Sequence, residues 1–103
     1  MEIASFVLNI READQAEYIK RHEAVYPELL QAFREAGVKK YSIFMHGGTL
    51  FAYMEAENFN EAMAYIGRQE ANTRWQAFMS DLLVMHESGS AIKIIPEVFH
   101  FEA

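Results

Sequence analysis

Tyr18 and His22 are the pair of side chains whose types and spacing best suit acid–base chemistry. They are four residues apart in a segment with helical periodicity, so they lie next to each other on one helix face. An imidazole with an ordinary pKa of about 6.5 can give or take a proton at neutral pH. A neighbouring phenol offers a hydrogen-bond donor and acceptor. A histidine on an apolar helix face is more often a hydrogen-bonded core residue than a catalyst, so spacing alone leaves both interpretations open.

Tyr41 and Trp75 are candidates to complete a binding site around this pair. Tyr41 shares one face of a predicted strand with Ile43 and Met45, so its hydroxyl could reach the same space. Trp75 provides a flat apolar surface of the kind that packs against a sugar ring. Inward-facing Tyr and Trp side chains are also ordinary core residues, and that alternative stays open for both.

Metal chemistry finds little support in the sequence. The chain contains no cysteine, which excludes disulfides, thiol nucleophiles and thiolate metal ligands. The run from His22 to Tyr26 resembles the zinc-binding pattern HExxH, but Tyr26 stands where the second histidine would be. The other histidines show no ligand spacing: His46, His86 and His100. We therefore expect no metal in this protein.

The composition indicates a small acidic protein. Its 103 residues suit a single domain. Fifteen acidic and nine basic residues give a net charge of −6, which disfavours nucleic acid and anionic lipid surfaces as partners. The apolar stretches are too short for a transmembrane helix, and the first residues do not resemble a secretory signal. We expect a cytoplasmic protein.

The first half of the chain predicts a strand, an interrupted helix and a hairpin. β-branched and aromatic residues predict a strand over residues 3–10. Helical spacing follows over residues 13–36, but Pro27 should kink or restart this helix because proline lacks an N–H group. Two further strands and their hairpin turn come next: residues 38–46, Gly47–Gly48 and residues 50–56.

The second half predicts two helical pieces and a last strand. Asn58 and Glu61 have the spacing of a capping box, so a short helix should begin there. Gly67 interrupts this helix, and Pro96 falls near the start of the last strand, where a missing donor is tolerated. The expected second helical piece and last strand are residues 71–84 and residues 94–101.

The element order βαββαβ predicts an α+β, ferredoxin-like fold, with an antiparallel sheet and helices on one face. Apolar side chains nevertheless point to both faces of the predicted strands. Phe6 and Leu8 point one way in the first strand, whereas Ile3 and Val7 point the other way. If helices cover one face, a second copy of the chain is the simplest cover for the other. We therefore predict a homodimer joined sheet to sheet.

The region around Tyr18 and His22 resembles a known family motif. Tyr18, Arg21-His22 and the run Tyr26-Pro27-Glu28-Leu29 are similar to YxxRHxxxWPEL, the helix motif of the L-rhamnose mutarotase family. Later segments resemble the family in the same order: Gly37 with Tyr41-Ser42-Ile43-Phe44, Arg74-Trp75 with Phe78-Met79-Ser80-Asp81, and Glu97-Val98-Phe99. The resemblance spans nearly the whole chain, so we expect residues 1–103 to form a single mutarotase-like domain.

This resemblance implies a fold, an assembly and a reaction. Family members are small homodimers with the dimeric α/β-barrel arrangement, need no cofactor or metal, and interconvert the α and β anomers of L-rhamnose. It implies an isomerase of L-rhamnose metabolism in which His22 is the proton donor. It further implies that Tyr18 and Tyr41 bind sugar hydroxyls and that Trp75 lines the pocket.

Three positions depart from the family pattern. Gln76 stands where a second tryptophan is common, Tyr26 replaces the tryptophan before the proline, and His100 replaces a tyrosine. We expect Gln76 to contact substrate through its amide, which makes a related sugar such as L-fucose or L-mannose an alternative substrate. Two alternative functions share the expected scaffold: a cofactor-independent monooxygenase and a non-catalytic sugar-binding dimer.

Overall fold

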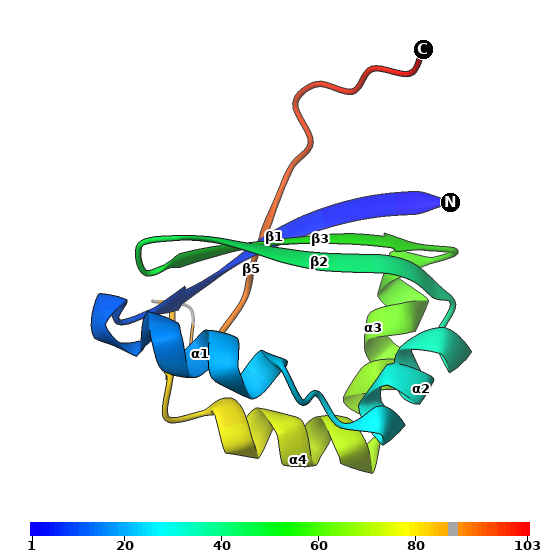
Figure 1. Cartoon of the computed structure of the whole chain (residues 1–103). Coiled ribbons are helices and arrows are strands. Elements are labelled where there is room, and N and C mark those ends of the chain that lie inside the picture. Colours follow the sequence, from blue (N-terminus) through cyan, green and yellow to red (C-terminus); the bar gives the residue numbers. More distant parts are fainter. Residues whose placement is uncertain (87–88) are drawn as a thin grey trace.

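The computed structural model describes residues 1–86 and 89–103. A curled antiparallel sheet lies over a layer of helices (Figure 1). The strands are β1 (Glu2–Ile10), β2 (Val38–His46), β3 (Thr49–Ala56), β4 (Leu83–Val84) and β5 (Lys93–Ile95). The helices are α1 (Gln15–His22), α2 (Pro27–Glu35), α3 (Phe59–Gly67) and α4 (Glu70–Met79), with a 3₁₀ turn at Glu12–Asp14. The ferredoxin-like α+β prediction is confirmed.

The predicted break at Pro27 divides the first helical region into α1 and α2. Tyr26 is extended, with ψ of 129°, and Pro27 occupies the first turn of α2, where its missing N–H group costs no hydrogen bond. The carbonyl oxygen of Tyr26 accepts from the N–H groups of Leu29 and Leu30 and so begins the new helix. The break leaves His22 in the last turn of α1, close to the bend.

The Gly47–Gly48 hairpin also forms as predicted. Gly47 has a φ of +58°, a conformation that glycine adopts without strain. A Cβ atom on Gly48 would lie 2.3 Å from the carbonyl oxygen of Ile10, so this position has no room for a side chain. The N–H group of Ile10 donates to the Gly48 carbonyl oxygen at 2.8 Å, which ties the hairpin to the end of β1.

The second helical region differs from the sequence prediction at its end. Asn58 caps α3 as expected, because its side chain accepts from the N–H group of Glu61 at 2.9 Å. The predicted helix over residues 71–84 is too long, since α4 ends at Met79 and Leu83–Val84 form β4 instead. These two residues pair with Asn9 and Ile10, so the end of β1 supplies backbone partners that a longer helix would forgo.

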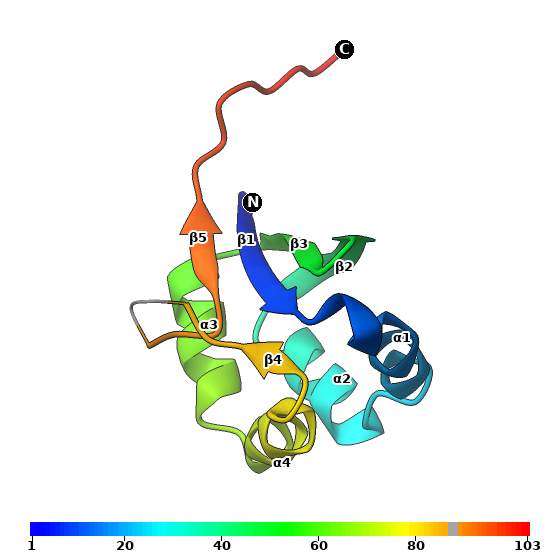
Figure 2. The ribbon, with the colours of Figure 1, turned by 90° about the vertical axis from the view of Figure 1, so that its left-hand side faces the viewer.

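The last strand is much shorter than predicted. β5 pairs with β1 through Ile95, Ile94 and Lys93 (Figure 2). It ends before Pro96, which cannot donate a backbone hydrogen bond. Residues 96–103 form no strand and extend away from the sheet on the side opposite the helices (Figure 1), so the prediction of a strand over residues 94–101 is wrong beyond residue 95.

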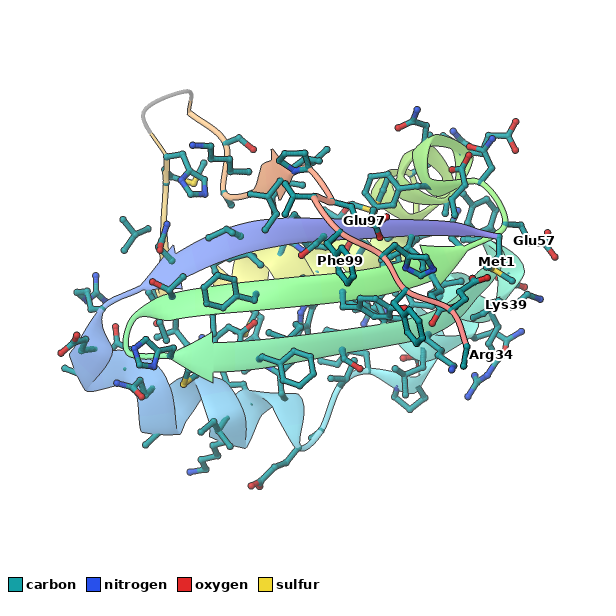
Figure 3. All side chains as sticks on the ribbon, turned by 90° about the horizontal axis from the view of Figure 1, so that it is seen from above. Met1, Arg34, Lys39, Glu57, Glu97 and Phe99 are labelled. Atoms are coloured by element: carbon teal, nitrogen blue, oxygen red, sulfur yellow. The ribbon has the colours of Figure 1, made fainter. Side chains whose placement is uncertain are left out.

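Both faces of the sheet are apolar, as the strand patterns predict. The inner face packs on the helices through fully or almost fully buried side chains, among them Phe6, Leu50 and Met54. Figure 3 looks onto the outer face, which no helix covers and over which the C-terminal segment passes. Large apolar side chains of this face remain partly exposed: Ile3, Phe44 and Phe51.

Among the described residues, no helix is long and apolar enough to cross a membrane.

Candidate active site

A cavity of about 610 Å³ lies between the inner face of the sheet and the helices. This volume falls within the range of about 300–1,000 Å³ that is typical of small-molecule sites. Its walls come from side chains, most of them apolar, of β1, β2 and β3 and of the helices α1, α2, α3 and α4. The site residues predicted from the sequence all line this one cavity: Tyr18, His22, Tyr41, Trp75 and Gln76.

The imidazole of His22 is held by a hydrogen bond to its own helix. Its Nδ1 lies 3.0 Å from the carbonyl oxygen of Tyr18. A carbonyl oxygen only accepts, so Nδ1 carries the hydrogen and donates it. In the neutral ring this leaves Nε2 with a lone pair, able to exchange a proton with a molecule in the cavity.

Burial lowers the pKa of His22 below its ordinary value of 6.5, and the hydrogen bond to Tyr18 opposes this effect in part. The ring is therefore mostly neutral at pH 7. A neutral imidazole with Nδ1 protonated is suited to accept a proton at Nε2 and then to return it as an acid.

Aromatic side chains hold the His22 ring on two sides. The ring of Tyr18 stacks on it at a centroid distance of 4.3 Å and an interplanar angle of 26°. The indole of Trp75 meets it at 90° and 5.2 Å, and Tyr26 packs on the same indole at 86° and 5.1 Å. Tyr18 and Trp75 come from α1 and α4, so the position of His22 depends on how these two helices pack.

Tyr18 and Tyr41 both keep their phenolic hydrogens at physiological pH. Burial raises the pKa of Tyr18 to about 12. The pKa of Tyr41 is also raised, first by burial and then by its proximity to Tyr18. The Tyr41 ring packs between Phe6 at 6.1 Å and Phe33 at 5.5 Å. Both tyrosines can therefore donate and accept hydrogen bonds as neutral hydroxyls in an apolar cavity.

Gln76 and Asn72 form a polar section of the cavity wall. The side-chain amide nitrogen of Gln76 lies 3.5 Å from Oδ1 of Asn72, one turn earlier in α4. Gln76 is exposed at the rim, whereas neighbouring Trp75 is only 7% exposed. Sequence reasoning missed Asn72, although its spacing of three and four residues from Trp75 and Gln76 places it on the same helix face.

The remaining histidines lie outside this cavity. His100, in the C-terminal segment, approaches Glu102 at 3.1 Å and Glu97 at 3.7 Å. His86 Nε2 lies 3.1 Å from the carbonyl oxygen of Val7. Within the described part of the chain, no group of three or more His, Asp or Glu side chains could hold a metal ion.

Comparison with known proteins gives a consistent family. The family model for L-rhamnose mutarotase matches residues 4–101. An L-rhamnose mutarotase from Burkholderia orbicola is 33% identical over 99% of this chain and 100% of its own length. One from Ligilactobacillus salivarius is 37% identical over 84% of each chain. The crystal structure of an L-rhamnose mutarotase from Formosa agariphila superposes with a TM-score of 0.83 and 28% identity, covering 99% of this chain and 100% of that one.

More distant structures share only the fold. A putative antibiotic biosynthesis monooxygenase from Nitrosomonas europaea has a TM-score of 0.64 at 11% identity, covering 90% of this chain and 84% of its own. A dimeric ferredoxin-like protein from an uncultured marine organism has a TM-score of 0.63 at 14% identity, covering 98% and 97%. The family model matches residues 4–101, and an L-rhamnose mutarotase is 33% identical over 99% of the chain, whereas the distant structures share the fold alone. The chain therefore belongs to the L-rhamnose mutarotase family.

Proposed function

We propose that this protein is an isomerase that interconverts the α and β anomers of L-rhamnose. One observation carries the proposal beyond family membership. His22, with Nδ1 fixed as a donor, lines the same 610 Å³ cavity as two neutral tyrosines and the indole of Trp75. The cavity thus brings a proton-exchanging group together with hydroxyl partners and a flat apolar surface.

Mutarotation requires a proton to move between two oxygen atoms on the same carbon. The proton on the anomeric oxygen O1 must leave while the ring oxygen O5 gains one, so that the C1–O5 bond breaks and a C1=O1 aldehyde forms. Rotation about the C1–C2 bond and reclosure then give the other anomer. General acid–base assistance of this kind is worth about 10²–10⁴-fold in rate.

His22 is the proton donor of this reaction and acts through Nε2. The neutral ring accepts the O1 proton at Nε2, and the resulting imidazolium donates a proton to O5. The lowered pKa of His22 suits this order, because the ring begins neutral and the imidazolium gives up its proton readily. The acid is therefore formed within the reaction and need not be present beforehand.

The other cavity residues bind and orient the sugar. Tyr18 and Tyr41 exchange hydrogen bonds with sugar hydroxyls, and Trp75 packs against the apolar face of the ring. Gln76 offers an amide at the rim for a hydroxyl on the part of the sugar that points outward. Neither a metal nor a cofactor takes part.

The active form is a homodimer joined through the outer faces of the two sheets. Phe44, Phe51 and Ile3 are 65%, 40% and 39% exposed on that face. Such a surface is costly in water, and a second copy buries it symmetrically. The enzyme is cytoplasmic. The reducing environment of that compartment disfavours disulfide bonds, and a chain without cysteine does not depend on them.

Anomer exchange of L-rhamnose, followed by saturation-transfer NMR, tests this function. Purified protein should raise the exchange rate well above the spontaneous rate. Oxygen uptake with a quinol-like substrate would instead support the monooxygenase alternative. Sugar binding without faster exchange would support a non-catalytic binding protein.

A further inference from the structure

Arg21, the residue before His22, makes an extensive set of contacts outside the cavity. Its Nε donates to Oε2 of Glu17 at 2.8 Å. Its Nη1 donates to the carbonyl oxygen of Phe78 at 2.7 Å and to Oδ1 of Asp81 at 2.8 Å, and Nη2 donates to Oδ2 of Asp81 at 3.1 Å. The Arg21 side chain is only 13% exposed, which is low for a surface arginine.

These contacts join the last turn of α1 to the end of α4. Glu17 and Arg21 belong to α1, whereas Phe78 lies in the last turn of α4 and Asp81 in the turn after it. The guanidinium carbon of Arg21 also lies 4.6 Å from the centre of the Phe78 ring. One side chain therefore fixes the distance between two helices that are far apart in sequence.

The same connection reaches the aromatic side chains around His22. The Phe78 ring packs against the indole of Trp75 at 5.7 Å and against Tyr26 at 6.4 Å. Trp75 in turn meets the His22 ring at 5.2 Å. Arg21 itself does not line the cavity, so any effect it has on a bound sugar passes through these neighbours.

We propose that Arg21 is a positioning residue: by binding Asp81 and the Phe78 carbonyl, it holds α1 against α4 and keeps the His22 ring between Tyr18 and Trp75. This inference depends on the proposed function only for its kinetic consequence. The geometric part concerns the His22–Trp75 contact and can be measured without substrate.

The geometry requires arginine at this position. A planar guanidinium can bind both carboxylate oxygens of Asp81 while it also reaches Glu17 and the Phe78 carbonyl. A lysine ammonium is a single point with a different donor geometry, so it cannot reproduce this arrangement. The carboxylates of Glu17 and Asp81 are substantially exposed, with side-chain exposures of 46% and 65%. Ion pairs of this kind add little to stability, so loss of position should be measurable without loss of the fold.

Trp75 is the chain's only tryptophan and reports directly on this geometry. A protonated imidazole beside an indole quenches its fluorescence, so fluorescence measured between about pH 4 and 8 follows the titration of His22. Tyr18 on α1, Tyr41 on β2 and Glu23 after α1 are the other ionisable side chains that line the cavity with Trp75 and His22. Tyr26 packs on the indole itself, and the guanidinium of Arg74 on α4 lies over the Tyr26 ring. The variant His22→Ala should lose the transition, which assigns it to His22.

The experiment compares Arg21→Lys and Asp81→Asn with wild type. Arg34→Lys is the matched control, because Arg34 makes a side-chain hydrogen bond only to Gln31 of its own helix among the described contacts. We expect both test variants to unfold thermally close to wild type and to show a smaller pH-dependent fluorescence change. In the anomer-exchange assay kcat should fall about tenfold while KM changes much less, because misplacing a catalytic group lowers the reaction rate more than it weakens substrate binding.

The outcomes separate this inference from the proposed function. If wild type does not accelerate anomer exchange, the proposed function fails and the fluorescence titration still decides the role of Arg21. Arg21 has no positioning role if both variants show the wild-type titration, or if both keep wild-type kcat in an active enzyme. A double variant with no larger effect than either single variant would show that Arg21 and Asp81 act as one unit.

Discussion

His22 Nδ1 lies 3.0 Å from the carbonyl oxygen of Tyr18, so the Nδ1–H donates to the helix backbone and Nε2 is the nitrogen left for chemistry. The neighbouring residue Tyr18 thereby contributes twice to the site. Its carbonyl selects the tautomer of His22, and its ring stacks on the imidazole at 4.3 Å. The four-residue spacing that first indicated the pair produces both contacts.

The pH dependence of the reaction follows from the lowered pKa of His22. In the proposed mechanism neutral His22 accepts the O1 proton, so kcat/KM should be level near pH 7–8. It should fall as the pH drops through the His22 pKa, below about 6.5. A pH profile of the exchange rate checks this. Activity that instead rises as the pH falls through this range would mean that imidazolium is the starting form.

The same pKa shift affects stability. The unfolded chain binds a proton on His22 at a higher pH than the folded chain does. Stability due to this residue is therefore full above pH 6.5 and is lost as the pH falls from there to the folded-state pKa. Urea unfolding of wild type and His22→Ala between about pH 5 and 8 measures the difference, and the comparison removes contributions from other groups such as His100. Parallel curves for the two proteins would contradict the assignment.

Removing the hydroxyl groups of the cavity tyrosines should weaken sugar binding. Tyr41→Phe and Tyr18→Phe keep the rings and their packing, so kcat/KM should fall about tenfold for each lost hydrogen bond. Tyr65→Phe is the control, because the Tyr65 hydroxyl donates to Glu35 outside the cavity. Steady-state kinetics with L-rhamnose checks this prediction, and wild-type values for both cavity variants would exclude the hydroxyls from binding.

Gln76 should influence which sugar is preferred. L-mannose differs from L-rhamnose by a hydroxyl on C6, and the Gln76 amide can form a hydrogen bond with such a group. Gln76→Trp should lower kcat/KM for L-mannose relative to L-rhamnose by about tenfold, the value of one neutral hydrogen bond. Gln31→Trp changes an exposed glutamine of α2 that does not line the cavity and serves as the control. An unchanged ratio in Gln76→Trp would place the amide away from the substrate.

The outer face of the sheet should hold the homodimer together. Phe44→Asp places a charge on the most exposed of the three apolar side chains Ile3, Phe44 and Phe51 of that face and should shift the protein from dimer to monomer. Light scattering after size exclusion measures this against the 11.9 kDa of one chain. Gln31→Asp adds the same charge on α2 as a control. A wild-type protein of one chain's mass would contradict sheet-to-sheet assembly.

Local sequence signals predicted most of the fold. The break at Pro27, the Gly47–Gly48 turn and the Asn58 cap depend on the conformation of a few neighbouring residues, and the structure contains all three. In the second half of the chain, the predicted ends of the last helix and the last strand were wrong, because these ends depend on partners distant in sequence. β4 forms because Leu83–Val84 pair with the backbone of β1, and the residues around Leu83 contain no sequence pattern that indicates this pairing.

The candidate site likewise has features that local sequence predicts and features that depend on residues distant in sequence. The Tyr18–His22 pair and the inward faces of Tyr41 and Trp75 were predictable from helical and strand periodicity, and these side chains line one cavity. The Arg21–Asp81 pair was not predictable from spacing, because its members lie 60 residues apart and meet only when α1 packs beside α4. The tautomer of His22 likewise required the position of one carbonyl oxygen.

The most direct test of the account is the anomeric exchange rate of L-rhamnose in the presence of wild type and of His22→Ala, measured by saturation-transfer NMR. Wild type should accelerate exchange strongly. His22→Ala should lose about 10²–10⁴-fold of that acceleration while it keeps the wild-type mass and fold. Wild-type protein that leaves exchange at the spontaneous rate would contradict the proposed function, and a fully active His22→Ala variant would contradict the role of His22.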